Sequence, residues 1–143
     1  MSLIDLSTRA AMTLASTVLL TNQIQRLANF YETLLQNAPT WYRDDYAAFD
    51  TPGSTLALFT VAGHDEHIRR GAAGGGENRS MKIEFEVEDI AATYERLRDD
   101  DEAYDWVRSP PADMPWGTRI VVLRDPDGHL VELYAPLEAS ETA

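Results

Sequence analysis

The sequence RIVVLRDPDGHLVELYAP, residues 119–136, has two apolar runs on either side of an Asp-Pro-Asp-Gly turn. Proline presets φ in such a turn, and Gly128 can take the left-handed conformation that closes it. The stretch therefore predicts a β-hairpin. One carboxylate, Glu132, stands inside the second run, where strand alternation places it on a sheet face. Glu132 could be a metal ligand, a ligand-binding group or a solvated strand residue.

The composition limits the classes of partner. The 143 residues include 24 acidic and 12 basic side chains, for a net charge of −12, and no cysteine. This charge disfavours nucleic acid and anionic membranes, and it favours a cationic ligand if it enters a cleft; alternatively, it only keeps the protein soluble. The lack of cysteine excludes disulfides, thiolate zinc sites and cysteine nucleophiles. No apolar run approaches the roughly 18 residues of a membrane span, and we expect a cytoplasmic protein.

The two halves of the chain show the same order of expected elements. In the first half, the β-branched stretch 14–21 predicts a strand, and residues 23–36, with apolar side chains at helical spacing, predict a helix. Two short strands and a firm strand at 54–61 follow. In the second half, residues 81–87 alternate strictly, residues 88–99 have one apolar helical face, and three strands follow. The sequence therefore predicts an α+β fold of two βαβββ modules.

The expected domain boundaries follow from these elements. Residues 14–62 and 81–136 are the two modules, and residues 1–13 and 137–143 are an N-terminal extension and a C-terminal tail. Residues 63–80 are rich in glycine and charge and show no period. They predict a flexible linker without secondary structure.

The histidines are weak candidates for a site. His64 and His67 have an H-x-x-H spacing that suits zinc, but they lie in the predicted linker, which would not fix the directions of ligands. We therefore expect no metal there. His129 follows the Asp-Pro-Asp-Gly turn, and we expect it to be exposed at the end of the hairpin, without a partner for catalysis.

Strand alternation assigns side chains to two faces of each sheet. In the second module, Ile83, Phe85 and Val87 form the apolar face that meets the helices. We call the opposite face the open face. On the second module it would carry Lys82, Glu84, Glu86, Leu130, Glu132 and Tyr134, and on the first Ser16, Val18, Leu20, Thr55, Ala57 and Phe59. These faces would line a cleft if the sheets curl together, or they would simply be solvated, as antiparallel sheets permit.

Three stretches carry a family resemblance: ASTVLLTNQIQRLANFYETLL, KIEFEVEDIAATYERLR and MPWGTRIVVLRDPDGHLVELYAP. Together they resemble the vicinal oxygen chelate superfamily, which includes glyoxalase I, bleomycin resistance proteins and extradiol dioxygenases. The resemblance covers residues 14–136. It implies curved modules around a ligand or metal cleft, and a homodimer. It does not fix the chemistry, because this fold carries both enzymes and binding proteins.

The resemblance also implies where a metal would bind. Metal-bearing members place a ligand on the first and last strand of each module, and those positions fall on Ser16, Ala57, Lys82 and Glu132. Only Glu132 has a metal-binding side chain, so it is a weak candidate, because a catalytic metal normally has three or more protein ligands. Lys82 could instead form an ion pair with Glu132. We therefore expect a member without a metal cofactor.

Two functions of different class fit this sequence. The first is metal-free binding or sequestration of a small molecule, cationic or aromatic, as in bleomycin resistance proteins. Its ligand-binding residues would be Lys82, Glu84, Glu86, Trp116, Arg119, Glu132, Tyr134 and Phe59. Trp116 would cover the cleft mouth or plug the gap between modules, and Arg119 would meet Glu132 or the ligand. The alternative is an enzyme: a metal-dependent lyase, isomerase or dioxygenase with substituted ligands, or a metal-free catalyst in which Glu132 acts as general base.

Overall fold

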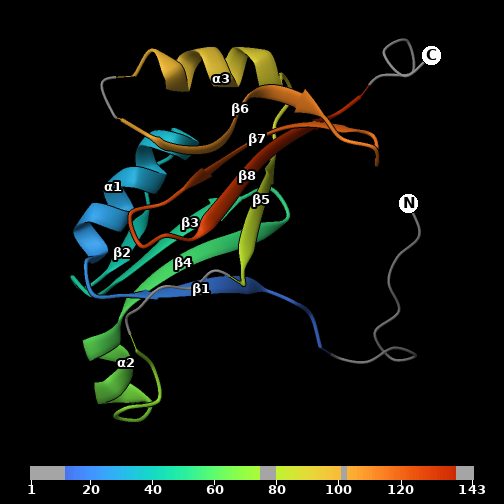
Figure 1. The fold of residues 1–143 in the computed structure, drawn as a ribbon. Helices are drawn as coiled ribbons and strands as arrows, with labels where there is room; N and C mark the ends of the chain where they lie inside the picture. Colours follow the sequence, from blue (N-terminus) through green and yellow to red (C-terminus); the bar gives the residue numbers. More distant parts are fainter. Residues whose placement is uncertain (1–11, 75–79, 101–102, 138–143) are drawn as a thin grey trace.

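In a computed structural model that describes residues 12–74, 80–100 and 103–137, the chain forms the two predicted βαβββ modules (Figure 1). The first consists of β1 (Ser16–Thr21), α1 (Ile24–Leu35), β2 (Thr40–Tyr42), β3 (Tyr46–Thr51) and β4 (Ser54–Thr60). The second consists of β5 (Lys82–Glu86), α3 (Ile90–Arg98), β6 (Asp105–Asp113), β7 (Thr118–Arg124) and β8 (Leu130–Pro136). Most of the predicted N-terminal extension and C-terminal tail lies outside the described residues. No helix in the described ranges has the length and apolar character needed to cross a membrane.

Each module contains one four-stranded sheet with the same topology. The strand orders are β1-β4-β3-β2 and β5-β8-β7-β6. In each sheet the first and last strands of the module pair in parallel, and the other pairs are antiparallel. The predicted α+β duplication is therefore confirmed.

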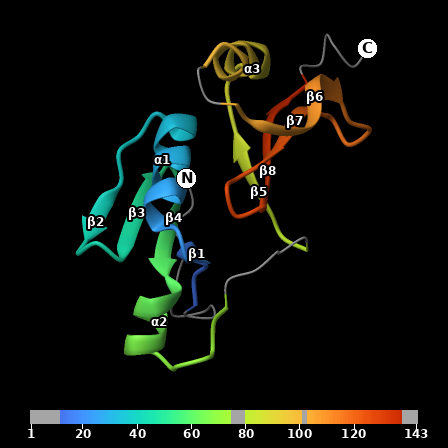
Figure 2. The same ribbon diagram turned by 60° about the vertical axis from the view of Figure 1, so that its left-hand side comes forward.

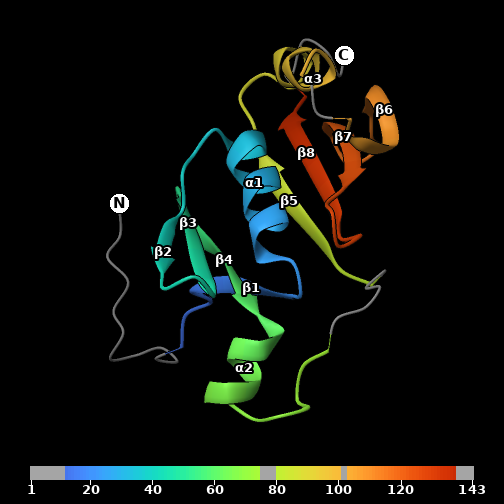
Figure 3. The same cartoon turned by 90° about the vertical axis from the view of Figure 1, so that its left-hand side faces the viewer.

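Helix α1 lies between the two sheets (Figure 3). Its Tyr31 is fully buried, and the ring lies 6.3 Å from Phe49 of the first sheet and 6.5 Å from Phe85 of the second. Leu27 and Leu34 of the same helix belong to a single apolar core that takes side chains from both sheets. Because both sheets turn their helix-packing faces toward α1, their open faces point away from one another.

Helix α2 (Val61–His67) corrects the prediction of a linker without secondary structure. The Thr60 side chain caps this helix by accepting a hydrogen bond from the backbone N–H of Gly63 (2.9 Å). A Cβ at Gly63 would lie 2.6 Å from Cε1 of Phe59, so glycine lets the helix lie directly on the sheet. Gly63, one of the glycines in the predicted linker, is thus a packing residue. The predicted boundary at residue 62 falls inside α2, and residues 75–79 lie outside the described residues.

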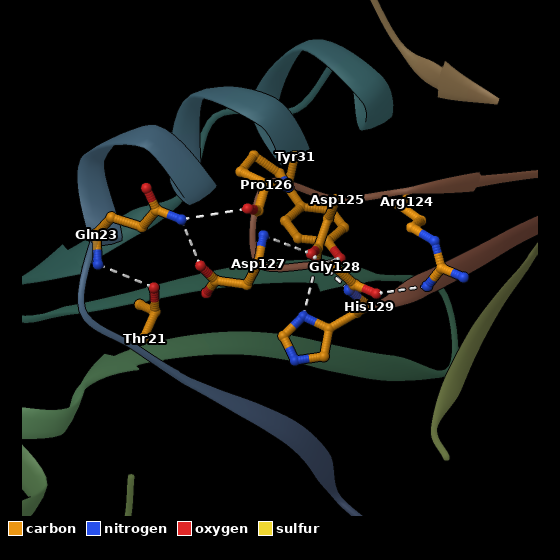
Figure 4. A network of polar contacts seen from close by, with 9 residues as sticks. All are labelled: Thr21, Gln23, Tyr31, Arg124, Asp125, Pro126, Asp127, Gly128 and His129. Atoms are coloured by element: carbon orange, nitrogen blue, oxygen red, sulfur yellow. Dashed lines mark hydrogen bonds and ion pairs between the residues drawn. The ribbon is translucent and has the colours of Figure 1, made fainter. Parts of the chain in front are cut away.

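A buried hydrogen-bond cluster joins the two modules (Figure 4). The Asp125 carboxylate, in the turn between β7 and β8, accepts hydrogen bonds from the Tyr31 hydroxyl (2.6 Å) and from Nδ1 of His129 (2.8 Å). It also accepts the backbone N–H groups of Asp127 and His129. Gln23, at the start of α1, donates to the Asp127 carboxylate. His129 is only 7% exposed, so the expectation of an exposed, unpartnered histidine was wrong.

The pairing of His129 with Asp125 predicts a pH-dependent contribution to stability. The hydrogen bond to Asp125 raises the pKa of His129, against the opposing effect of burial. Because the folded-state pKa exceeds the unfolded value of about 6.5, this contribution is fully present below that value and is lost as pH rises through the folded-state pKa. His129→Gln should therefore lower the free energy of unfolding more near pH 6 than near pH 9.

Urea unfolding of both proteins across that range measures the effect. His67→Gln is the matched control, because it replaces an exposed histidine of α2 outside the Asp125 cluster. A difference between native protein and His129→Gln that stays constant with pH would contradict the expected linkage.

Candidate functional site

Neighbouring strands β5 and β8 position the central residues of the open face on the second sheet. Their parallel register pairs Lys82 with Leu130, Glu84 with Glu132, and Glu86 with Tyr134. Paired residues share a sheet face, so the predicted grouping of these six side chains is confirmed. Ile83, on the opposite face, packs against the apolar core as expected.

Lys82 and Glu132 form an ion pair at the centre of this face. The Lys82 Nζ lies 2.8 Å from Oε1 of Glu132 and 3.5 Å from Oε2 of Glu84. Glu132 is only 3% exposed, whereas Lys82 and Glu84 are exposed. The hydrogen bond to Glu132 raises the pKa of Lys82, against a smaller opposing effect of burial. The expected pairing is present, and it gives the buried carboxylate a cationic partner.

Tyr134 and Glu86 extend the site along the two strands. The Tyr134 hydroxyl donates a hydrogen bond to Oε1 of Glu86 (3.3 Å). Partial removal from water raises the pKa of Tyr134, and the negative charge of Glu86 adds to the effect. Glu132 and Glu84 place two carboxylates at the ammonium of Lys82, and Glu86 adds a third negative charge further along β5. This part of the open face is therefore negatively charged overall.

Sequence reasoning missed the residues that β6 and β7 add to this face. The register places Val122 beside Glu132 and Ile120 beside Tyr134, and Arg108 of β6 lies beside Val122. Counting back from the turn through the antiparallel hairpin would have identified Val122 and Ile120. Arg108 could not be assigned in this way, because the pairing of β6 with β7 shifts its register on both sides of Arg108 and the sequence does not show those shifts. Val122 and Ile120 are buried, at 9% and 5% exposed, so they support the face from within the chain.

Arg119 and Trp116 do not contribute as predicted. Arg119 pairs with Ala135, so it lies on the opposite face of the sheet from Glu132. Its Nε donates a hydrogen bond to Asp113 (2.6 Å), which lowers the pKa of that carboxyl. Trp116 lies in the turn between β6 and β7 and is 69% exposed, so within this chain it neither plugs the modules nor forms a buried wall.

Phe59 lies on the other sheet, apart from the Lys82–Glu132 pair. Its ring lies 5.4 Å from that of Tyr46 and 6.1 Å from that of His64. It borders a separate hollow of about 440 Å³ whose lining residues all belong to the first module or α2. Because the open faces of the two sheets point apart, this chain does not bring Phe59 together with Glu132.

The positions that the resemblance implies for a metal do not suit one. Lys82 and Glu132 lie on the open face of the second sheet, whereas Ser16 and Ala57 lie on that of the first. Ala57 offers only a methyl group, and Lys82 carries a positive charge. Across the described parts of the chain, no group of three or more His, Asp or Glu side chains is arranged to hold a metal ion. The available donors therefore do not match a divalent cation.

Comparison with known proteins gives consistent matches. A family model described as the Glyoxalase/Bleomycin resistance protein/Dioxygenase superfamily matches residues 13–133. The uncharacterized protein YraH of Bacillus subtilis (strain 168) is 27% identical over 124 residues, which cover 83% of this chain and 94% of that protein. A glyoxalase/bleomycin resistance protein/dioxygenase structure from Nocardioides has a TM-score of 0.71 and 27% identity, with 95% of this chain and 91% of the other covered. A glyoxalase-related enzyme from Fulvimarina pelagi has the same fold, with a TM-score of 0.70, 24% identity and coverage of 90% and 94%.

The duplicated βαβββ topology, the hairpin of residues 119–136 and these matches agree. The chain belongs to the Glyoxalase/Bleomycin resistance protein/Dioxygenase superfamily.

Proposed function

We propose that this protein binds a small organic cation on the open face of the second sheet, without a metal cofactor. The observation that carries the proposal is the ion pair between Lys82 and the buried carboxylate of Glu132. Lys82 already supplies the positive charge that Glu132 would otherwise need from a metal ion. Glu84, which also lies 3.5 Å from the Lys82 ammonium, and Glu86 are exposed carboxylates that can accept a cationic ligand, because one lysine offsets only one of the three negative charges.

The surroundings of these carboxylates favour an organic cation over a simple ion. The Tyr134 ring is half-buried beside these carboxylates and offers a surface for cation–π contact. A cationic aromatic compound could meet both kinds of group. The attraction of exposed carboxylates is screened by salt, so affinity should fall as ionic strength rises.

We further propose that the complete cleft forms between two copies of the chain. Helix α1 lies between the sheets, so the parts of the open faces that carry Phe59 and Glu132 do not face one another within one chain (Figure 3). The open face of the first sheet presents Val18, which is 42% exposed, and Tyr42, which is 71% exposed. A homodimer in which this apolar face meets the charged face of a second copy would close the site.

A metal-dependent lyase, isomerase or dioxygenase is the alternative, and metal content distinguishes it. Protein incubated with zinc, nickel, iron or manganese salts and then desalted should retain far less than one metal ion per chain, because Lys82 already pairs with Glu132. Elemental analysis measures this directly. One tightly held ion per chain would contradict the metal-free proposal and favour the enzyme.

Replacing the outward carboxylates should weaken cation binding. The double variant Glu84→Gln and Glu86→Gln keeps the shape of the face but removes two negative charges. We expect the affinity for benzyltrimethylammonium, measured by calorimetry at low salt, to fall by roughly tenfold, as for the loss of one or two partly exposed ionic contacts. Glu95→Gln, an exposed residue paired with Arg98 on α3, is the matched control. Equal affinity in all three proteins would refute a role for this face.

The dimer should depend on the open face of the first sheet. Val18→Glu introduces a charge on the exposed side of the edge strand β1 without touching the core, so the fold should persist while association weakens. Light scattering should report a dimer for the native protein and a monomer for the variant. A native protein that remains monomeric at high concentration would rule out the dimeric cleft.

A further inference from the structure

We propose that the ligand is an elongated amphiphile, whose cationic head binds Glu84 and Glu86 and whose apolar tail passes round the edge of β5 into a groove between the modules. This inference rests on the proposed function, because the head occupies the same site. It goes beyond that function by naming the shape of the ligand and the place of its second half.

The edge of β5 leaves a route from the open face to the helix side of the sheet. β5 is the first strand of its sheet and has β8 as its sheet neighbour, and it is the strand nearest the first module (Figure 2). In parallel pairing, alternate residues direct both backbone groups to the neighbouring strand. The N–H of Val87 donates to the carbonyl of Tyr134 in β8, so the backbone groups of Glu84 and Glu86 point the other way. A ligand can therefore pass along this edge and hydrogen-bond to it.

The first of two adjoining hollows lies along this edge and has the character of a head-group site. Its volume is about 560 Å³. The β5 wall presents Glu84 and Glu86 together with Lys82, which is paired with Glu132, and the facing wall presents Thr17, Ser54 and Thr55 of the first module. Apolar side chains, among them Leu56 and Met81, complete the lining. The carboxylates and hydroxyl groups suit a cationic head, and the apolar part suits the first methylenes of a tail.

The second hollow has the character of a tail site. It measures about 280 Å³ and lies between the end of α1, the helix α3 and β5. Leu34, Leu35, Val87 and Leu133 give it an apolar lining. It shares five lining residues with the first hollow, among them Glu86. The two hollows therefore adjoin, and apolar lining continues from the first into the second through Phe85 and Val87.

The lining of the second hollow also includes polar groups, which limit the length of apolar tail that it can hold. Arg96 of α3 donates hydrogen bonds to the carbonyls of Thr33 (3.3 Å) and Leu34 (3.0 Å) at the end of α1. Asn37 donates to the carbonyl of Asp50 (2.9 Å). These contacts hold α3 and β3 against the end of α1. Affinity should therefore rise with tail length only until the apolar space is filled.

The test uses alkyltrimethylammonium salts of increasing length, from butyl to decyl, below their micelle concentrations. Calorimetry should show dissociation constants that fall by up to about fourfold per added methylene, and then level off. A dissociation constant that does not change with chain length would overturn the tail groove. If the shorter members still bound and needed Glu84 and Glu86, the proposed function would stand while this inference failed.

A variant that fills the groove gives a second, independent test of where the tail binds. Thr93→Phe places a ring into the second hollow without adding charge. It should reduce octyl binding to the level of butyl binding and leave butyl binding unchanged. Ala91→Phe, on an exposed position of the same helix, is the matched control and should change neither. Leu35→Asn, which makes the groove wall polar, should have the same effect as Thr93→Phe if that variant folds poorly.

Two outcomes would distinguish failure of the tail groove from failure of the proposed cation site. Octyl binding that is equal in Thr93→Phe, Leu35→Asn and Ala91→Phe would refute the groove alone. Failure of every member of the series to bind the native protein would refute both the groove and the proposed cation site.

Discussion

The hydrogen bond between Tyr31 and Asp125 ties the two halves of this molecule together at the edge of their shared apolar core. It links the helix of the first module to the turn that precedes the last strand of the second. The Asp125 carboxylate accepts four donors in a buried position, so its hydrogen-bonding capacity is largely satisfied. Losing one of these donors would leave a buried acceptor without its partner, which costs more than the net strength of a single bond. The position of Glu132 relative to the first module therefore depends on this cluster.

The ion pair of Lys82 with Glu132 matters for charge more than for stability. Desolvation offsets much of the attraction when one partner is buried, so such a pair contributes little to folding. Its effect is to remove the negative charge of Glu132 from the reach of an incoming ligand. Glu84 and Glu86 then set the electrostatic character of the face.

The sequence predicted the elements and faces well where alternation is regular. Residues 81–87 alternate strictly, which assigns Lys82 and Glu84 to one face, and the apolar neighbours Val131 and Leu133 assign Glu132 to the face opposite the core. The prediction failed for Arg119 because its face depends on the register of the whole hairpin. It failed for α2 because a glycine that packs against Phe59 looks, in sequence, like a glycine that permits flexibility.

Long-range partners were a second limit on prediction. His129 and Tyr31 are separated by 98 positions in the sequence, and both contact the same carboxylate. Local patterns cannot reveal that α1 from one half would supply a hydroxyl to a turn in the other. The position of α1 is also a long-range feature. The sequence allowed the open faces of one chain to line a common cleft, but α1 packs between the two sheets and their open faces point apart.

The position of α1 also has a consequence for folding. Its apolar side chains belong to one core with residues of both sheets, so each module lacks part of its interior when the other is absent. The two halves should then unfold together in one cooperative transition, although their topology is a repeat. A chain cut between α2 and β5 would have to bring its two pieces together before either could order. The duplication is visible in the pattern of strands, but the unit that folds is the pair.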